Sequence, residues 1–271
     1  MQNNENASKG ALDTDSPEEA AAFSYDTLEL SLPEMLKAGV HFGHRNSRWN
    51  PKMKPFIFGT RNNIHIIDLE KTLPLLQKAI DFLRSVVENG GKILFVGTKP
   101  QARQLVAAAA RETDMPYVTN RWLGGTFSNF NEIKRRIRYL NDQEDLEKSG
   151  DFKKYTKYEQ SQIRKEIARM NEKMGGIKKM EKMPQAVFLI DIKENALAVK
   201  ESQGAGIPTI AIVDTNTDPT LVDFPIPAND DATSSLKYIL AIVVKNIVET
   251  KKNVEIEKNN QTKNNKAMKL S

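Results

Sequence analysis

The sequence predicts an α/β fold of the flavodoxin or Rossmann-like type, in which a parallel sheet carries helices on both faces. Short apolar runs alternate with helix-length stretches over much of the chain, as in a doubly wound sheet. Apolar residues three and four apart interrupt this alternation at 128–183 and predict an inserted antiparallel coiled-coil helical hairpin. Neither end shows sustained apolar periodicity, so we also expect disordered termini.

The α/β domain is predicted to span residues 31–127 and 184–250, after an acidic extension. Residues 1–30 hold seven acidic residues and one lysine, and we expect them to be disordered. They lack a basic segment followed by an apolar core, so no secretory signal is predicted. Ser31 and Glu34 have the spacing of a capping box, which predicts a short helix ending near Gly39.

Four apolar runs have the length of strands covered on both faces. They are residues 64–68, 92–97, 186–191 and 209–214. Shorter strands are predicted around Tyr117 and Phe224, and together these segments are interpreted as one parallel sheet. Helices are predicted at residues 74–87, 100–113, 193–203 and 232–248. Residues 251–271 become rich in Asn and Lys and are predicted to form a flexible tail.

The hairpin is predicted from two arms of apolar residues separated by a polar break at residues 149–151. Its residues 128–183 contain fifteen Lys and Arg against ten Asp and Glu. A solvated face with intrahelical ion pairs explains this charge as well as an RNA-binding face does. The two arms are Phe130, Ile133, Ile137 and Leu140, then Ile163, Ile167, Met170, Met174 and Ile177.

Composition excludes several classes of protein. No uninterrupted apolar run reaches the roughly 18 residues of a transmembrane helix. With no cysteines, disulfides, Cys-ligated zinc and thiol nucleophiles are excluded, which suits the cytoplasm. The net charge of +5 is only a weak indication of a polyanionic partner.

The segment at residues 93–99 places Gly97 and Lys99 after a strand, where α/β enzymes bind phosphates. It lacks both the dinucleotide fingerprint and the phosphate loop, and we interpret it as a plain strand-to-helix turn. His41, His44 and His65 show neither a zincin spacing nor an accompanying nucleophile turn. No catalytic residue is predicted, and a nucleotide- or phosphate-using enzyme stays as an alternative.

Two segments, residues 41–55 and 120–126, combine basic, planar and glycine residues. Such residues neutralise phosphates, stack on bases and let a sugar–phosphate chain approach. Trp49 and Trp122 have an alternative role as core anchors. From these segments and the hairpin, the predicted RNA-binding residues are Arg45, Arg48, Trp49, Lys52, Lys54, Arg121, Lys134, Arg135, Arg136, Arg138, Arg164 and Lys165.

Five segments together resemble the bacterial and organellar family of the second protein of the small ribosomal subunit, in order from about Ser31 to Val248. They are MLKAGVHFGH at 35–44, WNPKMKPFIFG at 49–59, RWLGG at 121–125, GGI at 175–177 and IVDTNTDP at 212–219.

This resemblance implies a non-catalytic α/β domain with a protruding coiled-coil hairpin, located in the small subunit of cytoplasmic ribosomes. It implies binding to ribosomal RNA, through the basic loop and the hairpin, and recruitment of the large mRNA-binding first protein of the subunit. No required cofactor, no membrane and no homo-oligomer are expected. A free-standing RNA-binding regulator stays as a further alternative.

A candidate site for zinc or magnesium also follows. Asp191 and Asp214 end predicted parallel strands, where ligands of open α/β sheets bind. Asp230 and Asp231 begin the closing helix, and His44 packs nearby if the family's fold applies. The candidate ligands are His44, Asp214, Asp230 and Asp231. Alternatively, Asp230 and Asp231 cap the helix and Asp214 simply ends its strand.

Overall fold

The computed structural model describes residues 28–268. Residues 1–27 of the predicted extension lie outside the described residues. Residues 28–30 are already in place, because Lys245 donates a hydrogen bond to the carbonyl of Leu28 and Tyr238 donates one to that of Glu29. No helix within residues 28–268 is long and apolar enough to span a membrane.

The central sheet is parallel, as predicted, and holds five of the six predicted strands. These are β4 (Ile93–Val96), β5 (Tyr117–Val118), β6 (Ala186–Ile190), β7 (Thr209–Val213) and β8 (Phe224–Pro227). Their spatial order is β5-β4-β6-β7-β8, which is the flavodoxin-like order 2-1-3-4-5. The carboxyl ends of the strands therefore gather at one edge of the sheet.

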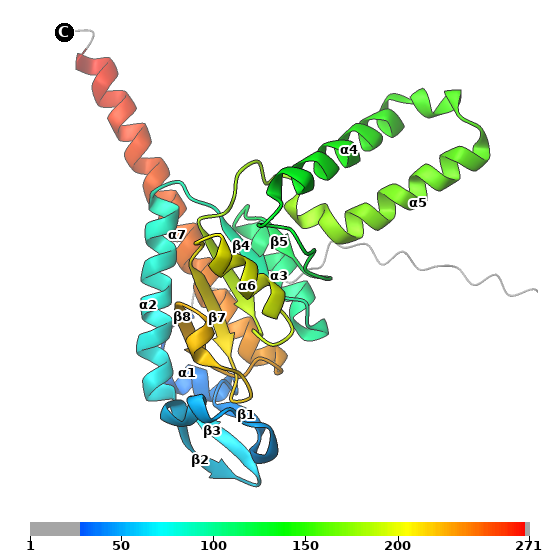
Figure 1. The fold of residues 1–271 in the computed structure, drawn as a ribbon. Helices are drawn as coiled ribbons and strands as arrows, with labels where there is room; N and C mark the ends of the chain where they lie inside the picture. The colour runs from blue at the N-terminus through cyan, green and yellow to red at the C-terminus, as the bar shows by residue number, and fades with distance from the viewer. Residues whose placement is uncertain (1–27, 269–271) are drawn as a thin grey trace, which may run out of the picture.

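Helices cover both faces of this sheet (Figure 1). On one face, α2 (Leu69–Glu88), α3 (Pro100–Glu112) and α7 (Thr233–Met268) pack against Phe95, Phe188 and their neighbours. On the other face, α6 (Ala196–Gly204) and the base of the hairpin cover residues such as Leu94 and Leu189. Alternate residues along each strand thus pack into two separate hydrophobic cores, one on each face of the sheet.

The first helix, α1 (Leu32–Lys37), ends at Ala38, and Gly39 follows with φ of +76°. The predicted capping box is wrong, because Ser31 makes no side-chain cap bond. The backbone N–H of Ser31 donates to the hydroxyl of Tyr238 at 3.4 Å. This N–H is the group that the Glu34 side chain would accept from in a capping box.

A small antiparallel sheet holds β1 (Phe42–Arg45), β2 (Ile57–Arg61) and β3 (Ile64–Ile67), in the order β1-β3-β2. The prediction that residues 64–68 join the parallel sheet is therefore wrong. The reason is the two-residue turn at Asn62 and Asn63, which have φ of 51° and 62°. Two positive φ values fit a type I′ hairpin turn, which pairs β3 with β2.

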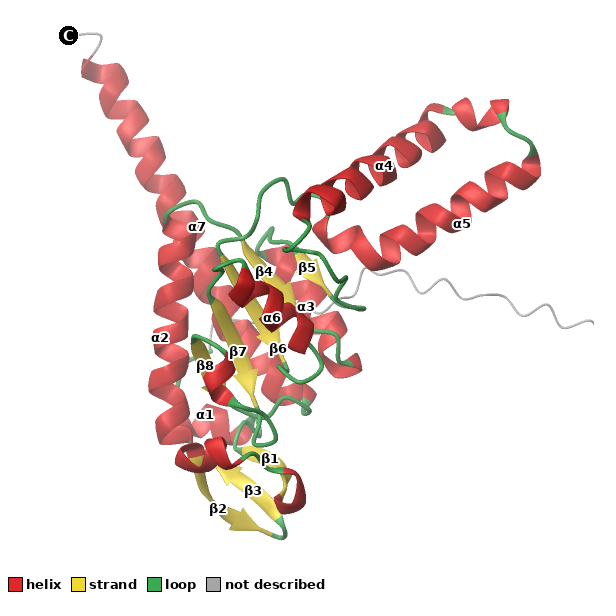
Figure 2. Cartoon of the chain, in the orientation of Figure 1, coloured by secondary structure: helices red, strands yellow, loops and turns green. Residues whose placement is uncertain are grey.

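The inserted hairpin is confirmed (Figures 1 and 2). It consists of α4 (Phe130–Ser149), a 3₁₀ turn at Asp151–Lys154, α5 (Lys157–Met174) and a second 3₁₀ turn, η5 (Gly175–Ile177), between β5 and β6. Leu140 and Ile167 are buried in its seam with Phe152. Gly150 reverses the chain with φ of +80°, and Thr156 with Glu159 forms a capping box at the start of α5.

The closing helix α7 continues to Met268, well past the predicted end at Val248. No glycine or proline follows Pro227, and a helix that is already nucleated extends at little cost. The loss of apolar periodicity after Val248 therefore does not mark the end of this helix. The flexibility of residues 251–271 stays a prediction.

Candidate nucleic-acid interface and charged cluster

The basic loop, residues 45–54, is held against the α/β domain by two anchors. Met53 is fully buried in the second core, and the backbone N–H of Asn50 donates to the carbonyl of Thr215 at 2.7 Å. Among the predicted RNA-binding residues, Arg45, Arg48, Trp49, Lys52 and Lys54 are exposed. Lys52 differs from the others because it pairs with Asp218 at 2.6 Å.

The two tryptophans have different environments. Trp122 is buried, stands edge-on to Phe127, and donates its indole N–H to Glu201 at 3.3 Å. Trp122 is therefore a core anchor, the alternative that the sequence left open. Trp49 keeps 37% of its surface exposed, with its ring 5.4 Å from that of His65, so it stays available to a ligand.

Glu201 organises the loop that carries Arg121, and sequence reasoning missed it. Its carboxylate accepts backbone N–H bonds from Gly125 at 2.8 Å and Phe127 at 2.9 Å. Partial burial raises the pKa of Glu201, but these hydrogen bonds outweigh it and lower the pKa overall. No signal near Glu201 in the sequence indicates this role, because its partners lie more than seventy residues earlier.

The basic residues of the hairpin divide into paired and unpaired ones. Arg135 and Arg136 both contact Glu132, at 3.0 and 3.7 Å, and Arg164 bridges to Glu147 of the other arm at 2.8 Å. Arg138 and Lys165 are exposed and form no ion pair within the described part of the chain. Lys134 places its Nζ 5.5 Å from the centre of the Phe130 ring. The hairpin thus carries both kinds of basic residue, some held in ion pairs on a solvated face and some available to RNA.

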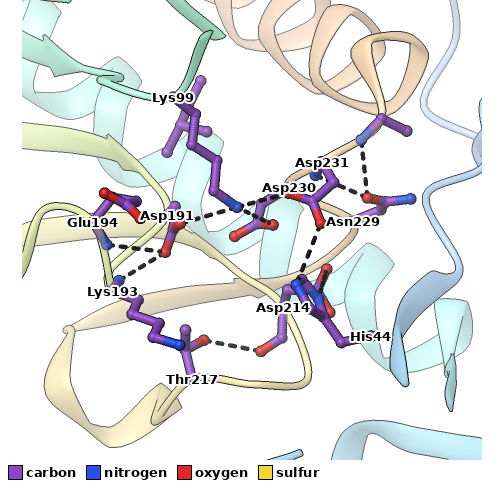
Figure 3. A network of polar contacts seen from close by, with 12 residues as sticks. His44, Lys99, Asp191, Lys193, Glu194, Asp214, Thr217, Asn229, Asp230 and Asp231 are labelled. Carbon is purple, nitrogen blue, oxygen red and sulfur yellow. Dashed lines mark hydrogen bonds and ion pairs between the residues drawn. The ribbon is translucent and has the colours of Figure 1, made fainter. Parts of the chain in front are cut away.

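A cluster of charged side chains fills the crevice at the carboxyl ends of the strands (Figure 3). Lys99, in the turn after β4, places its Nζ 2.9 Å from Asp191, 2.7 Å from Asp230 and 2.9 Å from Asp231. His44, from β1, contacts Asp214 through Nδ1 at 3.0 Å and Asp231 through Nε2 at 3.3 Å.

The charges in this cluster are strongly coupled. Burial, followed by repulsion from Asp214 and Asp191, raises the pKa of Asp230 to about 7, although Lys99 opposes the rise. The hydrogen bond to Asp214 raises the pKa of His44 despite partial burial. Burial acts against the ammonium of Lys99, but the surrounding carboxylates raise its pKa overall. The cluster is therefore a mixed-charge network in which each group depends on its neighbours.

The four predicted metal ligands do come together. His44, Asp214, Asp230 and Asp231 each offer one ligand atom, and these atoms lie within 4.8 Å of one another. Just before α7, the side chain of Asn229 accepts the N–H bonds of Asp231 and Ala232, and the carboxylates of Asp230 and Asp231 contact Lys99. The helix-capping alternative stays a prediction. Sequence reasoning missed Lys99 as the shared partner of three of the aspartates.

The surroundings of Lys99 also disfavour phosphate binding at this edge of the sheet. In nucleotide-binding relatives of this fold, phosphate sits at the helix N-terminus after such a strand. Here three carboxylates surround the lysine that would face a phosphate, and they would repel an anion. The chain is therefore an α/β protein of the doubly wound class, in which a network of its own charged side chains lies at the carboxyl ends of the strands and the basic segments lie outside that network.

The comparison with known proteins gives the family. The family described as Ribosomal protein S2 matches residues 35–250. The small ribosomal subunit protein uS2 of Roseiflexus sp. strain RS-1 is 48% identical over 220 residues, covering 81% of this chain and 84% of the relative. That of Fusobacterium nucleatum is 45% identical over 227 residues, covering 83% and 92%.

The chain belongs to the ribosomal protein S2 family, and the resemblance noted in the sequence is confirmed. This is a family of ribosomal proteins rather than enzymes, so the alternative of a nucleotide-using enzyme is set aside.

Proposed function

We propose that this protein is a structural component of the small ribosomal subunit, cytoplasmic in bacteria, that binds ribosomal RNA through its basic loop and its hairpin. The observation that carries this proposal is the exposure of Arg45, Arg48, Arg138 and Lys165 on two appendages of a protein in the S2 family. Exposed guanidinium and ammonium groups neutralise RNA phosphates. The α/β domain fixes where these groups are presented.

Incorporation into small subunits tests this proposal. Reversing four hairpin charges, as Lys134→Glu, Arg135→Glu, Arg136→Glu and Arg138→Glu, should reduce co-sedimentation with small subunits in a sucrose gradient at low salt. The difference from the wild type should shrink as salt rises, because fewer phosphate contacts make binding less sensitive to salt. A control variant reverses Lys37, Lys78, Lys200 and Lys237, four exposed lysines of the α/β domain. Circular dichroism checks that both variants fold. Normal incorporation of the hairpin variant at low salt would show that this face is only a solvated surface.

We further propose that the small antiparallel sheet helps recruit the mRNA-binding first protein of the subunit. Phe58 on β2 is 79% exposed and Phe42 on β1 is 47% exposed. Large exposed aromatic side chains on the two outer strands of one small sheet are typical of a protein-binding surface. A Phe58→Ser variant should still enter small subunits but retain less of the first protein there, as quantified by mass spectrometry. Equal retention would contradict this assignment.

A divalent metal at His44, Asp214, Asp230 and Asp231 is the second proposal for this end of the molecule. It is supported by the fully buried Asp230, whose Oδ2 has no hydrogen-bond partner among the described residues. Imidazole nitrogen with carboxylate oxygens suits zinc, and the carboxylates alone suit magnesium. The metal would stiffen the surface next to β1, where the partner protein is proposed to bind.

Elemental analysis after dialysis against trace metal tests the proposal. The wild type should retain about one equivalent of metal per chain, and an Asp214→Ala, Asp230→Ala variant should lose it. A control variant removes two exposed acids, Asp81 and Asp145, and should retain the metal. Near-zero content in the wild type would remove the proposal.

A further inference from the structure

A second basic surface lies at the end of the sheet opposite the basic loop. It is a groove of about 900 Å³ at the amino-terminal ends of β4, β5 and β6. The last turns of α2 and α3 form one side, and the segment that follows η5 at the base of the hairpin forms the other. In Figure 1 this region lies near the point where the hairpin leaves the domain. We call it the hairpin-base groove.

The lining of the hairpin-base groove has a surplus of positive charge. Two acidic residues face five basic ones. Asp114 is shared between Lys92 at 3.2 Å and Lys179 at 3.6 Å, and Lys178 pairs with Glu144 of the hairpin. Arg111 and Lys182 form no ion pair within residues 28–268. Internal ion pairs therefore leave much of the positive charge uncompensated.

Lys251 of α7 adds to this charge from the side. It donates a hydrogen bond to the carbonyl of Thr113, next to Asp114 of the groove. Burial and then the nearby charge of Lys92 lower the pKa of Lys251. Two ammonium groups that repel each other favour the binding of an anion near them.

The backbone of the hairpin-base groove is fixed before any ligand binds. A Cβ atom on Gly176 would lie 2.2 Å from the carbonyl oxygen of Tyr117, so η5 packs directly on β5 and only glycine fits there. Met180 is 6% exposed and anchors the next segment. Lys179 and Lys182, on either side of it in the sequence, are exposed.

The chemistry of the lining selects phosphates rather than bases. Tyr117 is the only aromatic residue among the lining residues, and one edge of its half-buried ring lies against Gly176. The lining therefore offers few rings on which bases could stack. We propose that the hairpin-base groove binds the phosphate backbone of RNA within the small subunit, without reading its sequence. This inference rests on the proposed RNA-binding function and adds a third contact surface to it.

The salt dependence of binding tests the proposal. The full chain is bound to small subunits stripped of their resident family member, over a series of salt concentrations. A groove variant carries Arg111→Gln, Lys179→Gln and Lys182→Gln, and a control carries Lys37→Gln, Lys200→Gln and Lys237→Gln, all at exposed positions. Each lost phosphate contact lowers the slope of log K against log salt by about 0.7–0.9, so the groove variant should lose about 2 and the control none.

The outcomes separate this proposal from the proposed function. A groove variant with the wild-type slope, while the hairpin-charge variant loses slope, overturns the groove and leaves RNA binding through the hairpin intact. Weaker binding with an unchanged slope assigns the groove to a protein contact and also overturns the proposal. Wild-type protein that binds stripped subunits without salt dependence contradicts the proposed RNA-binding function itself.

Discussion

Lys99 compensates three aspartates at once, and its side chain is only 13% exposed. Removing one member of a buried ion network leaves the others uncompensated, which costs more than the network itself contributes. We therefore predict that Lys99→Met lowers the free energy of unfolding by about 3 kcal/mol, measured by urea denaturation. Adding Asp230→Asn should recover part of that loss. A single variant as stable as the wild type would show that the carboxylates escape the penalty by binding protons.

Glu201 gives a pH-dependent prediction. Because its pKa is lowered in the folded state, its contribution to stability is fully present above the unfolded pKa of about 4.3. That contribution is lost as pH falls through the folded pKa. The stability difference between wild type and Glu201→Gln should therefore shrink as pH is lowered from 6 to 3 in urea unfolding experiments. A difference that stays constant over this range would contradict the role given to the carboxylate.

The sequence predicted the acidic residues and the histidine of the charged cluster, but not the lysine that they contact. Asp191 and Asp214 were predictable because a parallel strand ends at each of them, and those ends meet at one edge. Lys99 also follows a predicted parallel strand, but the segment at residues 93–99 alone indicates only a plain strand-to-helix turn. Its contact with Asp230, 131 positions away, has no signal of its own in the sequence.

Among the elements, the hairpin has the thinnest hydrophobic contact. Leu140 is fully buried and Ile167 is 7% exposed in the seam between the arms, and each arm depends on packing against its partner for stability. Changing both to Asp should unfold the hairpin locally while the central sheet keeps its structure. Hydrogen exchange measured by mass spectrometry should show loss of protection in α4 and α5. Unchanged protection there would contradict the paired seam.

Elements with a strong period were predicted well, and elements set by turn chemistry were not. The hairpin arms and the strands β4, β6 and β7 follow from their apolar spacing alone. The small sheet was missed because hydrophobicity alone places residues 64–68 among the buried parallel strands. The Asn62-Asn63 turn instead pairs them with the preceding strand. The length of α7 was missed because its polar second half gives no apolar signal.

The whole molecule presents its basic surfaces at two opposite ends. The basic loop lies beyond the carboxyl ends of the strands, and the hairpin with its groove lies at the other end (Figure 1). Because distant sites rarely couple, losses in binding free energy from Arg45→Gln with Arg48→Gln and from the groove variant should add within about 0.5 kcal/mol. Binding constants of the combined variant to stripped subunits measure this. A combined loss well below that sum would indicate a single shared contact.

The position of the hairpin within the chain also has a kinetic consequence. It separates β5 from β6, although β6 must pair with β4 in the middle of the sheet. Once β4 and β5 have paired, closing that contact spans roughly 70 residues from the end of β5 if the hairpin is unfolded. It spans only about 20 mobile residues once the hairpin arms have paired, which lowers the loop-closure cost by about 1 kcal/mol. The hairpin's contacts are local and form early. During synthesis, the folded hairpin would therefore bring β6 close to β4 and β5 before β7 and β8 have been made.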